Sequence, residues 1–339
     1  PVTSTNIYCE QRYATADGNR IAICRAPFGR LPQVWVCDMR SLRLCKAAEG
    51  WVTGANSPRG AVYFVTRRDE GWSLWRLDLN TVATKEMTSF DGSPPPCGSV
   101  SPDERWYVCG PFPSKDNVFG LRRIDLVSGR IDDLCEIEDM CNPHLQFEPS
   151  QGRHVLVQIN RGCRLNLPNG GMALTGKMGA TLCLVEVETG KVTPLPAGRP
   201  HTPPIMGHEC WLGHTGRVLF TAGHYDVSAS SFVTFGQPPP AEAHMPPGAI
   251  YSVAAGETKP AVVAQGLLYN HLAASDDGRF FIADDHTTGH ILIGNIKTGK
   301  TLRLCDSHTR QGSCQYSHAH AYMTPDNGFV VFNSIVTGV

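Results

Sequence analysis

The sequence lacks the features that mark membrane proteins and nucleic-acid-binding proteins. No apolar run in its 339 residues approaches the roughly 20 residues needed to span a bilayer. The formal net charge is only -1, so no basic surplus would attract a polyanion over a distance. We therefore expect neither a membrane nor a nucleic acid as a partner. An acidic ligand would need a local binding site.

Cysteine pairs with metal-site or redox spacing are also missing. The 13 cysteines include no Cys-x-x-Cys, and several lie inside apolar, strand-like runs, as do Cys24, Cys37, Cys109 and Cys183. We interpret them as buried, reduced thiols, which favours a reducing compartment. The expected location is the cytoplasm, with the periplasm as the alternative if a signal peptide has been removed.

Charged residues are scarce at 18%, and no long helical period is present, whereas Gly (34) and Pro (25) are frequent. One sequence pattern recurs instead. It consists of a turn, an apolar strand, a second strand in which apolar and polar residues alternate, a polar turn and a third strand. Its seven turns lie at Asp17-Gly18, Ser57 to Gly60, Ser101 to Glu104, Glu148 to Gly152, His214 to Gly216, Ser275 to Gly278 and Pro325 to Asn327. A period of roughly 40 to 65 residues predicts an all-β, seven-bladed β-propeller with four-stranded antiparallel blades.

We expect residues 1–339 to form a single propeller domain, with insertions at residues 161–179 and 225–247. The second insertion contains three consecutive prolines, Pro238 to Pro240, and is predicted to be a loop. The seventh unit reaches Val339 before its outer strands. Its blade is therefore expected to be incomplete unless N-terminal residues supply strands, because a propeller closes its ring to protect sheet edges.

Three potential metal ligands, Gln315, His318 and His320, lie within six residues of one another. Side chains alternate along a strand, so His318 and His320 would share a face and could chelate one ion. Gln315 has the wrong parity and would have to lie in an irregular segment before the strand. For an isolated His-x-His, a pair of surface histidines is the commoner explanation.

The positions of four histidines relative to the turns favour a shared site. His320 lies seven residues before Asn327 and His271 seven before Gly278. Likewise, each of the two preceding units has a histidine eight residues before its turn glycine, at His208 and His144. Innermost strands that end in equivalent turns would bring these side chains to one mouth of the central channel.

Four motifs around these histidines resemble those of the oligogalacturonate lyases, a polysaccharide lyase family with a seven-bladed propeller. They are Gln315-Tyr-Ser-His-Ala-His320 with Thr324 to Asn327 behind it, Asn270-His-Leu272 with Asp277-Gly278 and Ala283 to Asp285, Gly207-His-Glu-Cys-Trp211, and, more weakly, His144 to Pro149. The resemblance implies Mn²⁺ held by His271, Gln315, His318 and His320, with His208 as the general base. Glu209 points away from His208 on a strand and is interpreted as structural.

The sequence departs from this family at the arginine that neutralises the substrate acid. No matched motif carries it, since the aligned strand reads Ala180 to Leu184. Arg12, Arg161 and Arg164 are alternatives, and Arg12 and Arg164 are predicted to bind substrate. His144 and Gln146 share parity on their strand and are expected to bind sugar hydroxyls. A lyase acting on some uronic acid is therefore better supported than galacturonate specificity.

The residue types fit β-elimination from an acidic oligosaccharide. Removing the proton next to a carboxylate doubles the negative charge on one group, and a divalent cation offsets it. Three imidazoles and an amide suit Mn²⁺, and by ligand type also Zn²⁺, Fe²⁺ or Ni²⁺. The alternative is a non-catalytic propeller that binds glycans or proteins. A cupin-like oxygenase is disfavoured, because no glutamate follows His320 at cupin spacing.

Overall fold

The computed structural model describes residues 2–27, 29–91, 97–165, 172–223, 232–233, 248–285, 288–309 and 318–336. Regular structure in these ranges is β-strand, apart from one short 3₁₀ helix, η1 (Ser57–Arg59). No helix in this part of the chain is long and apolar enough to cross a membrane.

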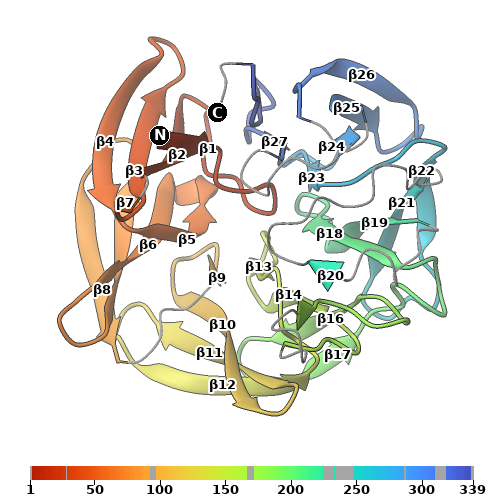
Figure 1. Ribbon diagram of the computed structural model, residues 1–339, viewed down its shortest axis with the longest axis horizontal. Helices are drawn as coiled ribbons and strands as arrows, with labels where there is room; N and C mark the ends of the chain where they lie inside the picture. Colours follow the sequence, from red (N-terminus) through yellow and green to blue (C-terminus); the bar gives the residue numbers. More distant parts are fainter. Residues whose placement is uncertain are drawn as a thin grey trace.

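Six four-stranded antiparallel sheets surround a common centre (Figure 1). The first three are β1 to β4 (Val2–Thr5, Arg20–Pro27, Gln33–Asp38, Arg43–Glu49), β5 to β8 (Trp51–Asn56, Ala61–Arg67, Trp72–Asp78, Thr84–Phe90) and β9 to β12 (Cys97–Val100, Trp106–Lys115, Val118–Asp125, Ile131–Glu138). The next three are β13, β14, β16 and β17 (Gln146–Phe147, His154–Ile159, Thr181–Glu186, Val192–Pro194), β18, β19, β21 and β22 (Ile205–Trp211, Arg217–Ala222, Ala249–Ala254, Ala261–Gln265) and β23 to β26 (Leu272–Ala274, Phe280–Asp285, His290–Asn295, Thr301–Asp306).

The predicted β-propeller class is confirmed, but the predicted count of seven four-stranded blades is wrong. The part of the chain that the structure describes has six such sheets, and the seventh unit contributes a two-stranded sheet of β27 (Tyr322–Met323) and β28 (Val330–Val331). This sheet lies between the sixth sheet and the first (Figure 1). Each turn in the sequence marks the end of an innermost strand, and such a turn does not require that outer strands follow.

All seven turns share one backbone feature. The residue at the equivalent place has a positive φ of 58–69° in every unit, and these residues are Gly18, Gly60, Glu104, Gly152, Gly216, Gly278 and Asn327. Glycine and asparagine adopt this left-handed conformation at low cost, which is why they recur. In four of the turns a Ser or Thr hydroxyl donates to the Asp two residues later. Because the turns are alike, residues counted back from them reach similar heights in the channel.

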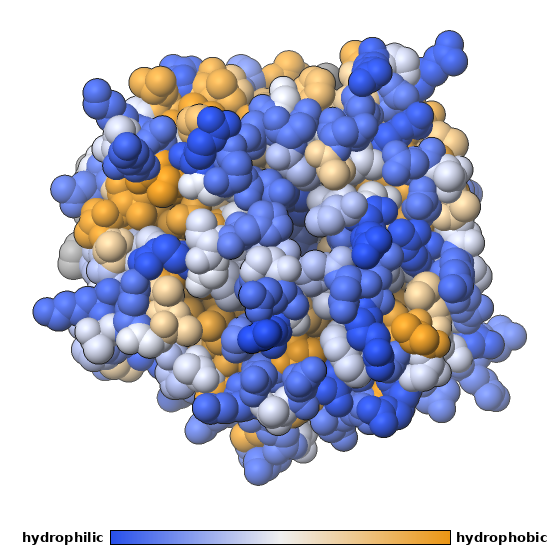
Figure 2. Space-filling view, turned by 180° about the vertical axis from the view of Figure 1, so that it is seen from behind, coloured by the Kyte–Doolittle hydropathy of each residue, from blue (hydrophilic) through white to orange (hydrophobic). Residues whose placement is uncertain are grey.

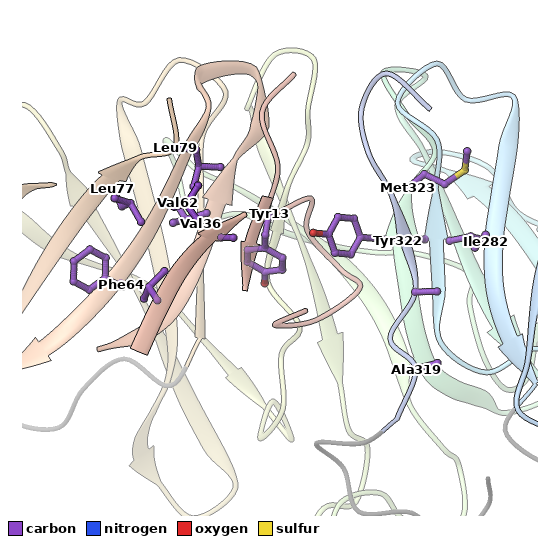
Figure 3. Packing of buried hydrophobic residues seen from close by; sticks show 14 of the residues in the cluster. Tyr13, Val36, Val62, Phe64, Leu77, Leu79, Ile282, Ala319, Tyr322 and Met323 are labelled. Carbon is purple, nitrogen blue, oxygen red and sulfur yellow. The ribbon is translucent and has the colours of Figure 1, made fainter. Parts of the chain in front are cut away.

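A hydrophobic cluster joins the first two sheets to the last ones and closes the ring. It contains Val36 of β3 and Leu77 of β7 on one side and Ile282 of β24 on the other. Between them the rings of Tyr13 and Tyr322 face each other across the junction (Figure 3), with centroids 6.3 Å apart in an edge-to-face arrangement. Both tyrosines are buried, so the junction is held by apolar packing as well as by hydrogen bonds.

Several exposed apolar side chains lie on the outer rim. Leu44 of β4, Val262 of β22 and Leu302 of β26 are examples, and each lies on the outermost strand of its sheet. On the face opposite to Figure 1, hydrophobic residues form separate patches within a largely hydrophilic surface (Figure 2).

The two insertions meet each other. β15 (Met172–Ala173) pairs with β20 (Phe232–Val233), which lies within the predicted loop 225–247. The other residues of that loop lie outside the described ranges. The short β15–β20 ribbon links the fourth and fifth blades, each of which places a predicted site histidine near the channel.

Candidate metal centre and active site

Three imidazoles converge where the sixth blade meets β27. One nitrogen from each of His271, His318 and His320 lies within 4.8 Å of the other two. The ring centroids are 4.3 Å apart for His271 and His320, and 5.5 Å apart for His271 and His318. His271 and His320 are buried, and His318 is half-buried. Neutral imidazole nitrogens at this separation fit a first-row divalent transition metal.

The predicted convergence of His318 and His320 is observed, but strand alternation is the wrong reason for it. Both residues precede β27 and lie in irregular structure. His320 has a φ of 45°, a left-handed conformation that is uncommon outside glycine. A local turn, not the pleat of a strand, therefore brings the two rings together.

Asp284 of β24 orients His271, which immediately precedes β23. The Asp284 Oδ2 atom lies 2.9 Å from His271 Nδ1, and the Asp284 Oδ1 atom accepts a hydrogen bond from the His271 backbone N–H at 2.8 Å. A carboxylate accepts hydrogen bonds, so Nδ1 is the protonated nitrogen and Nε2 is left to face a metal. Such a carboxylate behind a histidine ligand is a common feature of metal sites in proteins.

His208 lies beside this group, as its position in the sequence predicted. It belongs to β18, at a point where the pairing with β19 is irregular between Ile205 and Glu209. Its ring centroid is 4.2 Å from that of His271 and 6.3 Å from that of His144. The irregular register places His208 between the imidazole cluster and the blade-four histidine.

His144 has different surroundings. Its Nδ1 atom is 2.6 Å from Glu10 Oε1 and 3.4 Å from Glu209 Oε1, and its Nε2 atom is 2.8 Å from the Asn142 side-chain amide. Burial alone would lower the pKa of His144, but Glu10 and Glu209 outweigh it and raise the pKa to about 10. His144 is thus an imidazolium at neutral pH. Protein groups face both of its nitrogens, which argues against the expected contact with sugar hydroxyls.

A hydrogen bond between Gln146 and Glu209 joins β13 to β18 next to the histidines. The Gln146 side-chain amide donates to the Glu209 backbone carbonyl at 2.8 Å, and the Trp211 indole donates to the Gln146 carbonyl at 3.0 Å. Glu209 is fully buried, and that burial raises the pKa of its carboxyl group. These contacts give Gln146 a structural role and fit the interpretation of Glu209 as structural.

The candidate arginines do not join the histidine group. Arg12 donates to the Ala274 carbonyl at 2.7 Å and forms an ion pair with Asp276 at 3.0 Å, at the turn end of the sixth blade. Arg164 is exposed beside the loop that joins β10 and β11. Arg161 donates to backbone carbonyls between residues 178 and 199. The fourth predicted metal ligand, Gln315, lies outside the described residues.

Sequence reasoning missed the contribution of residues 6–12. Tyr8 lies against His320 with ring centroids 4.4 Å apart and stands edge-on to His271 at 6.1 Å. Further along, the Gln11 side chain bonds Ala55 and Gly98 of two inner strands. The segment therefore runs along the channel from the imidazole cluster towards the end of the inner strands where the turns lie. No repeat or motif marks it, because its contacts join the first residues of the chain to distant positions in the sequence.

Comparison with known proteins reveals the relationship at the level of structure. No protein-family model and no curated protein sequence matches the chain. Among solved structures, an oligogalacturonate lyase in complex with manganese superposes with a TM-score of 0.70 at 17% identity, covering 99% of this chain and 88% of that one. The oligogalacturonate lyase of Vibrio parahaemolyticus gives a TM-score of 0.68 at 15% identity, covering 100% and 89%.

Solved structures of other proteins are similar over nearly the same length. The hydrazine synthase of Kuenenia stuttgartiensis has a TM-score of 0.60 at 10% identity, covering 98% of this chain and 94% of that one. Proteins with different activities thus share the architecture, and function must be argued from the site. The resemblance to the oligogalacturonate lyases that the histidine motifs indicated is found again in the three-dimensional fold.

Proposed function

We propose that the protein is a metal-dependent lyase that cleaves uronic-acid-containing oligosaccharides of the oligogalacturonate, or pectin, type by β-elimination. The observation that carries this proposal is the group of three imidazoles with nitrogens within 4.8 Å of one another, with His208 4.2 Å from His271 between ring centroids. The structural neighbours named as oligogalacturonate lyases support the same reaction class.

The donor set fits a divalent metal. His271, His318 and His320 would hold the ion through neutral nitrogens, with Gln315 as the proposed fourth ligand. A site without an anionic ligand leaves the full charge of the ion for an anionic substrate. We propose Mn²⁺, with Zn²⁺, Fe²⁺ or Ni²⁺ as alternatives of compatible ligand chemistry. When bound, the ion would offset the charge that develops on the substrate carboxylate.

The remaining groups of the site have distinct roles in this proposal. His208 accepts the proton from the carbon next to the substrate carboxylate, because an imidazole titrates near neutral pH. Asp284 keeps His271 in the tautomer that presents Nε2. The imidazolium of His144 is neutralised by Glu10 and Glu209, so it supports the wall of the site and does not attract the substrate acid.

We further propose a single propeller domain working in a reducing compartment such as the cytoplasm. All 12 cysteines within the described ranges are free thiols. Cys109 and Cys183 are buried as expected, whereas Cys24 and Cys37 are only partly buried and Cys45 is exposed. Free thiols are typical of proteins from reducing compartments.

The test is to incubate metal-loaded protein with saturated oligouronides and to follow the ultraviolet absorbance of the new carbon–carbon double bond. Activity should disappear with a chelator, return on adding Mn²⁺, and be unaffected by His214→Gln, a half-exposed histidine near Asp276. No turnover of any uronide by metal-loaded protein would reject the lyase proposal and favour a non-catalytic binding propeller.

A further inference from the structure

Two asparagines from opposite ends of the chain hold the His318-Ala-His320 segment by its backbone. The Asn333 side-chain amide donates to the His318 carbonyl at 2.9 Å, and the Asn333 backbone N–H donates to the Ala319 carbonyl at 2.8 Å. The Asn6 side-chain amide donates to the His320 carbonyl at 2.7 Å. All three consecutive carbonyls therefore receive a hydrogen bond from one of these two residues.

The two asparagines are also bonded to each other. The Asn6 backbone N–H donates to the Asn333 side-chain oxygen at 2.8 Å, across 327 positions of sequence. Both side chains are buried, with 3% of Asn6 and 8% of Asn333 exposed. Two residues beyond Asn6, the Tyr8 ring packs on the His320 imidazole. We name Asn6 and Asn333 the asparagine bracket.

A bracket of this kind is needed because the segment has no strand ladder of its own. His318 and His320 precede β27, and His320 has a left-handed backbone with φ of 45°. Such a conformation persists only when its surroundings hold it. Because hydrogen bonds from Asn6 and Asn333 hold the carbonyls, they also set the directions of the two imidazoles.

We propose that Asn6 and Asn333 are positioning residues of the candidate metal centre and that they couple metal binding to closure of the propeller ring. This inference rests on the proposed metal site. A ligand that binds only the folded arrangement stabilises that arrangement. Metal held by His318 and His320 therefore tightens the junction between residues 2–12 and 318–336, and loosening this junction weakens metal binding.

The experiment compares Asn6→Ala and Asn333→Ala with Asn56→Ala in the full chain. Asn56 is a matched control, because it is 4% exposed and its side-chain amide likewise donates to a backbone carbonyl of the neighbouring blade, that of Ser101 at 2.9 Å. Binding of Mn²⁺ and Co²⁺ is measured by calorimetry, and the visible spectrum of bound Co²⁺ reports the ligand geometry. We expect both bracket variants to lose about 10- to 100-fold in metal affinity and to change the Co²⁺ spectrum, with Asn56→Ala unchanged in both.

Asn6→Ala keeps the backbone N–H that bonds Asn333 and removes the side-chain amide, so it tests the bracket with the smallest risk to folding. Hydrogen exchange followed by mass spectrometry gives a second readout. Metal should slow exchange in residues 2–12 and 318–336 of the wild type and do so much less in Asn6→Ala. Unchanged metal affinity and spectrum in both bracket variants would overturn the positioning role while leaving the metal site intact. Wild-type protein that takes up no metal would overturn the metal site and the bracket's role together.

Discussion

His320 and His144 occupy equivalent backbone positions and have opposite electrostatic surroundings. Each lies just before an innermost strand, β27 or β13, and each has a left-handed backbone, with φ of 45° and 48°. His320 lies beside two other imidazoles. In contrast, His144 lies beside the two carboxylates of Glu10 and Glu209. The first arrangement is suited to receive a cation, whereas the second makes the histidine itself the cation.

The comparison shows that a shared position in the repeat predicts where a side chain lies but not what it does. The roles are separated by neighbours from outside the repeat unit that contains each histidine. Glu10 comes from the N-terminal segment, and Glu209 comes from the adjacent blade beside His208. His208 lies between the imidazole cluster and His144, with its ring centroid 4.2 Å from that of His271 and 6.3 Å from that of His144. Its replacement is therefore the first test of the difference between the two regions.

Replacement of His208 by Ala should give the largest loss. If His208 is the general base, turnover falls by about 10²- to 10⁴-fold while metal content stays that of the wild type. Steady-state kinetics on an oligouronide, with metal analysis of the same sample, measures both. A variant that loses metal along with activity would instead place His208 among the ligands and extend the imidazole cluster towards His144.

Replacement of His320 by Ala removes one imidazole from the candidate metal centre. We expect a loss of turnover on the order of 10²- to 10³-fold, the usual cost of removing electrostatic stabilisation from an active site. Excess Mn²⁺ should restore part of the activity if the other ligands still bind. Full activity without added metal would show that His320 is not needed for catalysis.

The replacement Asp284→Asn keeps the shape of the residue behind His271 and removes its negative charge. Because Asp284 fixes the tautomer of His271, we expect metal affinity to fall about 10- to 100-fold. Competition with a metal-binding dye would measure the change. Asp277→Asn, at the turn of the same blade, is the control and should leave affinity unchanged.

The replacement Glu10→Gln should change how the free energy of unfolding depends on pH. The pKa of His144 is about 10 in the folded protein against 6.5 for the free side chain, so its stabilising effect is complete below pH 6.5 and is lost as the pH rises towards 10. The groups facing it are Glu10, Glu209, His208 and Tyr8, and burial keeps the Tyr8 phenol neutral by raising its pKa.

Urea unfolding across this pH range is the measurement. Wild-type stability should decline as the pH rises, and Glu10→Gln should show a shallower decline because one of the two carboxylates that hold the proton is gone. Glu257→Gln, which removes a partly exposed partner of Arg217, is the matched control. Parallel curves for wild type and Glu10→Gln would show that Glu10 does not set the charge of His144.

Much of the propeller could be predicted from turn chemistry and strand pattern. The turns at Ser275 to Gly278 and Pro325 to Asn327 have the expected form, and a strand precedes each of them, β23 (Leu272–Ala274) and β27 (Tyr322–Met323). The spacing of histidines from these turns correctly placed His271 and His320 together. These successes share a local cause, because a turn and its adjoining strands are specified by neighbouring residues.

The parts that could not be predicted depend on contacts between distant positions. Nothing in the local sequence distinguishes Asn6, Tyr8 or Glu10 from ordinary residues near a chain end, yet each reaches the candidate site. His144 was expected to bind sugar, because the carboxylates beside it come from other elements. The count of seven blades was wrong for a related reason, since a turn reports an inner strand and not the strands outside it.

The metal centre is best tested by the number of metal ions bound per chain, measured by elemental analysis of purified wild type, His320→Ala and His144→Ala. We expect one divalent transition metal per chain in the wild type and in His144→Ala, and substantially less than one in His320→Ala. A wild type without metal, or a His144→Ala variant that loses the metal while His320→Ala keeps it, would show that the imidazole cluster does not bind the ion.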